Sequence, residues 1–470
     1  MSKAMTSGSP AKHILSFAVP LFFGLLFQQL YNLADSAIVG RLLGSDSLAA
    51  VGSTGSIIFM LIGFCTGLCS GFAIPVAQSF GAGDIERMRR YIGTSVWLAA
   101  AASIFMTIGT MLLCRPILQW MHTPEAIQDQ AYDYLIIIFA AIPTTILYNL
   151  LSGYLRSLGS SKTSLYFLLL SSAINVILDL TLIRYFGCGV EAAAWATLIS
   201  QAVSGIGCLV YIVKRCEEMH LNREHLRFRK DCAAKLCYAG VPMGLQYTVT
   251  AVGSVILQTF LNGLGTACVA ASAAGVKICN LLACPFDALG STMATYCGQN
   301  AGAGKYSRIG SGIRSAGIIG SVYGIAAFLL MLRFSGTFAM LFLDGSEKEI
   351  LAYASRYIQI QTAFYIPLLF VNVLRFSIQG MGFSVLAISA GVMELIARAC
   401  AGFFLVPALG YTGACLGSPL AWILADLFLV PACVGCIRHL AAVGPAESAQ
   451  SEEHRKHSAI SAAKVNHAHA

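Results

Sequence analysis

Long runs of apolar residues that contain no charge constrain the fold of this chain more than any other feature. The first such run, Ile14–Ala34, has 21 residues and is followed by Asp35. A helix of about 20 apolar residues spans the hydrocarbon core of a bilayer. Of the 470 residues, 57% are hydrophobic and only 11% are charged, whereas a soluble domain has about 25% charged residues. The sequence therefore predicts a membrane protein with several spanning helices.

Apolar runs of similar length recur along the chain, separated by Gly, Pro and charged residues. The run 236–276 is too long for one helix, and we divide it at Asn262-Gly-Leu-Gly265 because this sequence favours a turn. The pattern predicts an all-α polytopic fold with twelve transmembrane helices, at about residues 14–42, 48–80, 91–114, 131–156, 164–185, 191–214, 234–262, 267–300, 312–333, 352–379, 385–408 and 413–438.

Lys and Arg residues are concentrated in the loops that follow even-numbered spans. These loops contain Arg87, Arg156, Lys162, Lys305 and seven basic residues between Lys214 and Lys235. Positive charge is retained on the cytoplasmic side of a membrane, and the first apolar run is too long for a cleavable signal peptide. We therefore expect a multi-pass protein of the plasma (inner) membrane with both termini in the cytoplasm. The same loops explain the net charge of +8, so we expect no nucleic-acid partner.

The second half of the chain repeats the first at an offset of 221 to 224 residues. Ala18-Val-Pro20 returns as Gly240-Val-Pro242, and Gln78-Ser-Phe-Gly-Ala-Gly83 returns as Gln299-Asn-Ala-Gly-Ala-Gly304. Six spans in each half give both halves the same orientation in the membrane. The repeat therefore predicts two six-helix lobes related by an axis along the membrane normal, with a cavity between them.

This repeat also predicts the division of the chain and the function of several paired residues. Pro20 with Pro242, and Pro143 with Pro367, predict helix bends that the lobes share. Glycine permits tight turns and close backbone approach, so we expect the cytoplasmic gate to be shaped by Gly81, Gly83, Gly302 and Gly304. The expected parts are a cytoplasmic N-terminus (1–12), an N-lobe (13–215), a cytoplasmic linker (216–232), a C-lobe (233–440) and a disordered cytoplasmic tail (441–470).

Asp35 is the first candidate functional residue, because it is a carboxylate inside an apolar segment. A carboxylate at membrane depth costs about 2.5 to 3.5 kcal/mol, so it normally faces a bundle interior or a wet cavity. The alternative is a carboxylate at a helix end, among the lipid headgroups. Asn175 and Asp179 are four residues apart and share one helix face, where they form either a functional site or a polar contact between helices.

Three motifs resemble the multidrug and toxic compound extrusion (MATE) family. They are Gln28-Gln-Leu-Tyr-Asn-Leu-Ala-Asp35, the segment 44–52 and Pro75-Val-Ala-Gln-Ser-Phe-Gly-Ala-Gly-Asp84. The resemblance covers about residues 12–440 and is most similar to the bacterial DinF-like branch. It implies secondary active multidrug export, in which a cation gradient drives organic, often cationic and amphipathic, compounds out of the cell by alternating access.

The resemblance also implies an ion site in the N-lobe. The matching positions are Asp35 on the first span, Asn175 and Asp179 on the fifth and Thr197 on the sixth, with Tyr31 and Asn32 as candidates for a supporting polar network. Oxygen ligands suit a hard cation such as Na⁺, and two neighbouring carboxylates also suit a proton, because like charges disfavour joint ionisation. We expect export to be coupled to one of these two ions. We expect no cofactor.

Acidic residues are distributed differently in the C-lobe. In another branch of the family, carboxylates on the seventh and tenth spans carry the coupling ion, and both spans lack them here. At the repeat offsets Asp35 corresponds to Leu257 and Asp179 to Gly402, which predicts coupling in the N-lobe alone. Glu394 and Arg398 have the spacing of a helix-face ion pair, Asp287 could pair with Lys277, and Asp426 has no assigned function.

Other functions remain open at this point. A lipid or lipid-linked oligosaccharide flippase has a related two-lobe plan but would need several basic residues for pyrophosphate, and few are present in the spans. A passive channel is also open. An enzyme is not expected, because the chain lacks a set such as His-Glu-x-x-His, and the 16 Cys residues lack metal-ligand spacing. We expect a monomer whose partners are small organic substrates and membrane lipid; the sequence does not identify the compound.

Overall fold

The computed structural model describes residues 4–121, 123–343 and 347–467. All regular elements within these ranges are helices, which confirms the predicted all-α class. Ten helical segments of the described chain are long and apolar enough to cross a membrane, and two pairs of bent helices raise the number of spans to twelve.

The first six spans come from helices that precede residue 216. These are α1 (Pro10–Leu42), α2 (Ser45–Gly81), α3 (Ile85–Trp120), α4 (Glu125–Ala140), α5 (Ile142–Ser157), α6 (Ser161–Leu180), which continues into the π-helical turn η1 (Thr181–Tyr185), and α7 (Glu191–Arg215).

A 3-10 turn, η2 (Glu217–Met219), lies in the linker before the second set of spans. This set consists of α8 (Lys230–Asn262), α9 (Thr266–Gly302), α10 (Tyr306–Ala339), α11 (Lys348–Ala363), α12 (Tyr365–Gly380), α13 (Ser384–Cys400) with the π-helical turn η3 (Ala401–Leu405), α14 (Val406–Leu409) and α15 (Tyr411–His467). The side chains after Val443 lie outside the described part, so disorder over 441–470 stays a prediction.

Two spans are broken at equivalent places in the two halves. The angle between α4 and α5 is 45°, and the angle between α11 and α12 is 50°. Pro143 and Pro367 lie in the first turn of α5 and α12, where a proline fits because its missing N–H would be unpaired anyway. The predicted shared bend at these prolines is confirmed. Pro20 and Pro242 instead lie inside the continuous helices α1 and α8.

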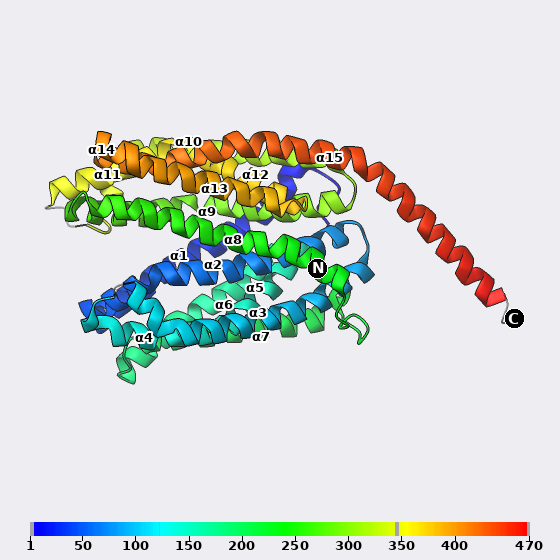
Figure 1. Cartoon of the computed structure of the whole chain (residues 1–470), viewed down its shortest axis with the longest axis horizontal. Coiled ribbons are helices and arrows are strands. Elements are labelled where there is room, and N and C mark those ends of the chain that lie inside the picture. Colours follow the sequence, from blue (N-terminus) through cyan, green and yellow to red (C-terminus); the bar gives the residue numbers. More distant parts are fainter. Residues whose placement is uncertain (1–3, 122, 344–346, 468–470) are drawn as a thin grey trace.

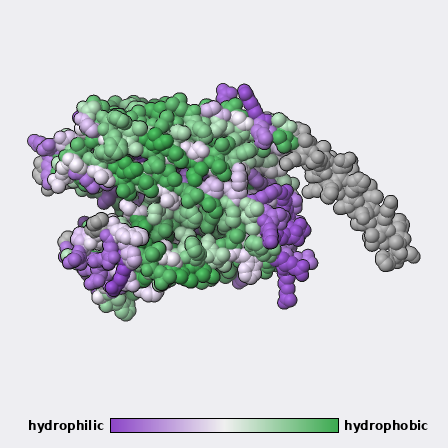
Figure 2. Space-filling view, in the orientation of Figure 1, coloured by the Kyte–Doolittle hydropathy of each residue, from purple (hydrophilic) through white to green (hydrophobic). Residues whose placement is uncertain are grey.

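The helices form two lobes that lie side by side (Figure 1), with α2–α7 in one and α9–α15 in the other. A hollow separates the lobes at the end of the bundle where α4 and α11 lie (Figure 2); we call this the open end. The loops after α2, α5, α7 and α9 lie at the opposite end, and these loops and the first turns of the helices that follow them contain Arg87, Lys162, Lys230 and Lys305; we call this the basic end.

Helices α1 and α8 each cross from one lobe to the other. Ile14 and Phe17 of α1 pack in a core cluster with C-lobe residues, whereas Val39, near the other end of α1, packs with the N-lobe. Leu236 of α8 packs in the main N-lobe cluster, and Leu261 packs in the C-lobe. The first half of each crossing helix therefore stabilises the lobe opposite to its own.

Candidate functional site

The four residues proposed for an ion site come together in the N-lobe. Asn175 on α6 donates a hydrogen bond from its Nδ2 to Thr197 Oγ1 on α7, at 3.3 Å. Asp179 lies one helical turn after Asn175 and is completely buried. Its carboxylate interacts with that of the half-buried Asp35 on α1. Three helices therefore direct the four side chains into one pocket, which we call the acidic pocket.

The acidic pocket contains more hydrogen-bond acceptors than donors. Asp35 Oδ1, Asn175 Oδ1 and both carboxylate oxygens of Asp179 are buried without a hydrogen-bond partner among the described residues. Within that part of the chain, no Lys, Arg or His nitrogen lies within 4.0 Å of either carboxylate. Buried polar groups are normally paired, and two like charges 4 Å apart repel by about 4 kcal/mol when the effective dielectric constant is 20. The pocket therefore fits a small cation, or a proton that the carboxylates share.

Two tyrosines lie near the carboxylates of the acidic pocket. Tyr31 of α1 and Tyr134 of α4 both lie within electrostatic range of Asp35 and Asp179. The sequence identified Tyr31 but not Tyr134, because no spacing rule relates the fourth span to the first. Asn32, the other supporting candidate, is exposed, and its side chain makes no hydrogen bond to the described residues; its backbone carbonyl accepts one from Ser36 Oγ. The structure thus brings Tyr31 to the pocket and leaves Asn32 outside it.

The equivalent position in the C-lobe is apolar. A Cβ at Gly402 would overlap the ring of Phe260, and a Cβ at Gly417 would press against Leu257. Both lobes nevertheless contain a π-helical turn at this level, η1 after Asp179 and η3 around Gly402. Because π-helical turns occur in both lobes, they belong to the shared scaffold. The carboxylates are what distinguishes the N-lobe.

The four predicted gate glycines divide into two kinds at the basic end. Gly83 and Gly304 have φ angles of 71° and 68°, which favour glycine, and a Cβ there would meet nothing within 4 Å. A Cβ at Gly81 would instead overlap the carbonyl of Gln299, and one at Gly302 would overlap the carbonyl of Gln78. Gly81 and Gly302 therefore permit close contact between the lobes, whereas Gly83 and Gly304 form turns.

Gln78 and Gln299 add a pair of symmetric hydrogen bonds to this contact. Gln78 Nε2 donates to the Gly380 carbonyl at 2.9 Å, and Gln299 Nε2 donates to the Ser157 carbonyl at 2.8 Å. Each glutamine thus reaches across to the opposite lobe. The sequence showed both residues as part of the repeated motif, but their partners lie more than 140 positions away. The lobes are therefore held together at the basic end by equivalent contacts from both halves.

The N-terminal segment covers the same contact. The Met5 N–H donates to Gln299 Oε1 at 2.7 Å, and Met5 is buried. Arg308 donates to the carbonyls of Gly8 and Met5, and Lys305 donates to the carbonyl of Thr6. Part of the predicted N-terminal segment 1–12 is therefore packed on the C-lobe.

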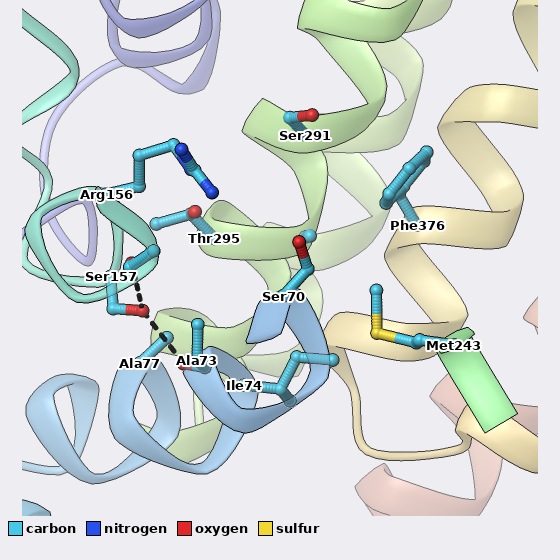
Figure 3. A pocket seen from close by; sticks show the side chains of 12 residues that line it. Ser70, Ala73, Ile74, Ala77, Arg156, Ser157, Met243, Ser291, Thr295 and Phe376 are labelled. Atoms are coloured by element: carbon cyan, nitrogen blue, oxygen red, sulfur yellow. Dashed lines mark hydrogen bonds between the residues drawn. The ribbon is translucent and has the colours of Figure 1, made fainter. Parts of the chain in front are cut away.

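A cavity between the lobes lies next to this contact (Figure 3). The space between its lining residues, counted together with the open solvent at its mouth, is about 430 Å³. Residues of α2, α5, α8, α9 and α12 line it: Ser70, Ala73, Ile74, Ala77, Gly153, Arg156, Ser157, Met243, Ser291, Ala294, Thr295 and Phe376. Arg156 is the one charged residue in this lining. The sequence placed it in a basic loop, but it belongs to the last turn of α5.

Charged residues of the C-lobe form a separate buried cluster. Glu394 Oε2 accepts a hydrogen bond from Arg398 Nη2 at 3.2 Å, which confirms the predicted ion pair. Arg375 of α12 also pairs with Glu394, and Asp426 lies within electrostatic range of Arg375. Glu394 therefore joins Arg375 of α12 to Arg398 of α13, whereas Asp426 Oδ1 is buried without a hydrogen-bond partner among the described residues. The sequence missed Arg375 because it is on another helix.

Asp287 and Lys277 do not pair, contrary to the prediction. The Lys277 Nζ lies 5.6 Å from the centre of the Phe342 ring. Asp287 is exposed and lies within electrostatic range of Tyr247, whose ring lies beside Gly63 of α2. The two side chains are ten residues apart on one helix, and this distance along the helix axis is too long for a direct contact. Asp287 lies one helical turn before Ser291, a residue of the cavity lining, on the same face of α9.

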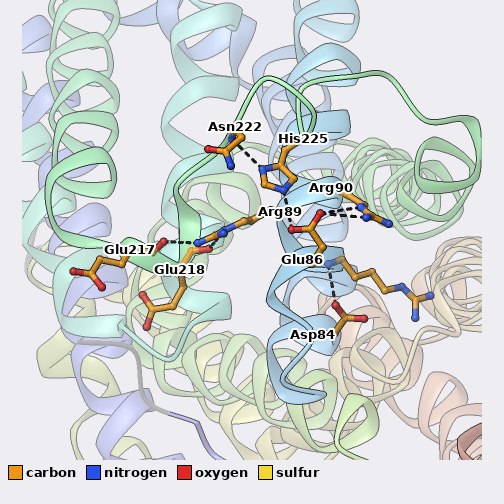
Figure 4. Close-up of polar contacts among 9 residues, drawn as sticks. Asp84, Glu86, Arg89, Arg90, Glu217, Glu218, Asn222 and His225 are labelled. Carbon is orange, nitrogen blue, oxygen red and sulfur yellow. Dashed lines mark hydrogen bonds and ion pairs between the residues drawn. The ribbon is translucent and has the colours of Figure 1, made fainter. Parts of the chain in front are cut away.

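The linker is fixed to the basic end of α3 (Figure 4). Arg89 donates hydrogen bonds to the carbonyls of Glu217 and Glu218. The buried His225 bonds through its Nε2 to Glu86 Oε2 at 2.9 Å, and its Nδ1 accepts the Asn222 N–H. These contacts give the described linker a defined conformation on the N-lobe.

Comparisons with known proteins agree with this architecture. A family model described as MatE matches residues 20–181 and 242–399, one stretch from each half of the chain. The chain is 30% identical over 363 residues to the probable multidrug resistance protein YoeA of Bacillus subtilis, covering 76% of this chain and 78% of that protein. It is 28% identical over 368 residues to the probable multidrug resistance protein YpnP of the same organism, covering 78% and 81%.

A solved structure also has the same fold. It is described as the outward-facing conformation of a multidrug resistance MATE family transporter of the MOP superfamily, and it superposes with a TM-score of 0.86 at 22% identity. The similarity covers 93% of this chain and 98% of that chain. At this identity the likeness concerns the fold, including the arrangement of twelve spans in two lobes.

Proposed function

The chain belongs to the MATE family of multidrug transporters, and from this membership we propose that it is a secondary active exporter driven by a cation gradient. The cation is a proton or Na⁺, and the exported compounds are organic amphipaths. The protein lies in the plasma membrane with its basic end toward the cytoplasm, so the hollow at the open end faces the outside of the cell. We propose that the protein acts as a monomer.

The observation that carries this proposal is the unpaired set of oxygens in the acidic pocket. Asp35, Asn175 and Asp179 present buried acceptors without donors among the described residues, and Thr197 shares a hydrogen bond with Asn175. Bound Na⁺ would be held by these oxygens, and a proton would be shared by the two carboxylates. Either ion removes the repulsion between Asp35 and Asp179, so ion binding and release change the stability of this pocket.

Helix α1 supplies a route from the acidic pocket to the other lobe. It carries Asp35 in its second half, and its first half packs in the C-lobe core through Ile14 and Phe17. Pro20 lies between these parts and removes one backbone hydrogen bond. Loading of the ion therefore favours a different bend of α1, which alters the cavity between the lobes and its access from each side.

Efflux of a fluorescent amphipathic dye from a pump-deficient host tests the proposed function. We expect cells that produce the protein to accumulate less dye than cells without it. A protonophore should abolish this difference if the proton is coupled, and a sodium ionophore should abolish it if Na⁺ is coupled. Equal dye accumulation with and without the protein would contradict export, and efflux that survives both ionophores would contradict cation coupling.

A further inference from the structure

The N-terminal segment, residues 4–9 before α1, is bound to the C-lobe through its backbone. Three C-lobe side chains donate hydrogen bonds of 2.9 to 3.3 Å to its carbonyl groups: Asn300 and Arg308 to Met5, Lys305 to Thr6, and Arg308 to Gly8. Hydrogen bonds from charged donors are roughly twice as strong as those between neutral groups. The basic side chains around the start of α10 therefore hold this segment in place.

The segment also has a defined shape. The Met5 side chain is buried and belongs to the same core cluster as Tyr296 of the C-lobe. Gly8 has a φ angle of 77°, which glycine adopts without steric cost. His13, in the first turn of α1, bonds through its Nε2 to the Ser7 carbonyl at 2.6 Å. The segment thus turns at Gly8 and places Met5 in the C-lobe.

Gln299 links this segment to the opposite lobe. Its Oε1 accepts the Met5 N–H at 2.7 Å, and its Nε2 donates to the Ser157 carbonyl of α5 at 2.8 Å. Both atoms belong to one planar amide, so a bond to Oε1 also fixes the direction of Nε2. Gln299 is completely buried, and an amide oxygen that loses its donor there is costly. The Met5 N–H therefore orients this amide toward the N-lobe.

The repeat allows an internal comparison. Gln78 occupies the equivalent position in the N-lobe and donates to the Gly380 carbonyl of α12. The segment that precedes α8 is the linker, which is fixed to α3 through His225 and Glu86, and none of its described residues bonds to Gln78. The bond from a preceding segment is therefore present at Gln299 and not at its counterpart, so it is an addition to the shared contact between the lobes.

We propose that the N-terminal segment is a latch that keeps the basic end closed by orienting Gln299 toward Ser157. Alternating access requires the lobes to separate at this end, so release of the latch favours the conformation that is open to the cytoplasm. This function of the segment rests on the proposed export function. A segment that only stabilised the C-lobe would act equally in both conformations and would leave their ratio unchanged.

Spin labels test the latch in the purified full chain in lipid nanodiscs. Lys162 and Ser311 are exposed at the basic end and lie in different lobes, so labels there measure the ratio of open to closed molecules. We expect deletion of residues 2–8 to raise this ratio about fivefold, the effect of one lost hydrogen bond. Gln299→Leu removes the bonds to both Met5 and Ser157 and should raise the ratio at least as much.

The two glutamines provide a matched pair of backgrounds for the deletion. In Gln299→Leu the deletion should have no further effect, because the latch acts through that amide. In Gln78→Leu, which loses the bond to Gly380 instead, the deletion should retain its fivefold effect, since independent contacts have additive effects. A purely structural segment would give the same result in both backgrounds.

Two results would overturn the proposal: unchanged distances after the deletion, or a fivefold effect that persists in Gln299→Leu. If the deletion variant does not insert, Gly8→Pro replaces it, because proline fixes φ near about −65° and cannot form the turn; the exposed Ser7→Ala is its control. The distances are measured without a gradient. Absence of dye efflux by the unmodified protein would therefore contradict the export function alone, and normal efflux with unchanged distances in the deletion variant would contradict the latch alone.

Discussion

Replacing Gly81 by Ala should destabilise the closed contact between the lobes. The new methyl group would overlap the backbone carbonyl of Gln299, which cannot rotate away as a side chain would, so α2 and α9 must move apart. Overpacking of this kind costs about 1 to 3 kcal/mol, and such a bias changes an equilibrium between two conformations by about 5- to 150-fold. We therefore expect the population to shift toward conformations that are open at the basic end.

Spin labels at Lys162 and Ser307 report this shift, because both residues are exposed at the basic end and lie in different lobes. We expect the distance distribution of Gly81→Ala to gain a longer component and transport to slow, with unchanged membrane insertion. Gly310→Ala is the matched control, since a Cβ at Gly310 meets nothing within 4 Å. The reasoning is refuted if Gly81→Ala and Gly310→Ala give the same distances and the same transport rate.

Three further predictions concern other parts of the molecule. Gly302→Val should act like Gly81→Ala in the same assays, since its Cβ would overlap the Gln78 carbonyl; normal transport would make Gly302 an ordinary loop residue. Glu394→Gln should lower the free energy of unfolding by about 3 to 5 kcal/mol, because Arg375 and Arg398 lose their shared carboxylate. Chemical unfolding measures this loss, and Glu349→Gln, which changes an exposed carboxylate, is the control. Equal stability of the two variants would contradict this prediction. In a Cys-depleted background, an impermeant thiol reagent outside intact cells should label a cysteine at Thr123 and not one at Asn222; labelling at 222 would reverse the orientation.

The sequence predicted what depends on local composition and on the repeat. The lengths of the apolar runs predicted where the spans lie. The prolines at equivalent positions, Pro143 and Pro367, predicted the two broken spans. The four-residue spacing of Glu394 and Arg398 was sufficient for their ion pair, because neighbouring turns of one helix fix that distance. The acidic pocket required the family resemblance, since its residues come from three helices.

Contacts between helices that are distant in sequence could not be predicted. Arg375 reaches Glu394 from another helix, Tyr134 reaches the acidic pocket from α4, and Arg156 turns into the cavity although its position looks like a loop. The crossing of α1 and α8 between lobes was also missed, because a repeat detected in sequence contains no information about which lobe each half-helix packs against. The incorrect pairing of Asp287 with Lys277 came from charge complementarity without a geometric constraint.

The central claim, that the acidic pocket couples a cation to export, is tested most directly by gradient-driven dye transport in vesicles containing Asp35→Asn or Asp179→Asn. Asp133→Asn, an exposed carboxylate on α4, is the control for the substitution itself, and Asp426→Asn tests the C-lobe. We predict that both pocket variants lose transport against a gradient while the Asp133 and Asp426 variants retain it. Concentrative transport by Asp35→Asn, together with its loss in Asp426→Asn, would contradict the account and assign coupling to the C-lobe.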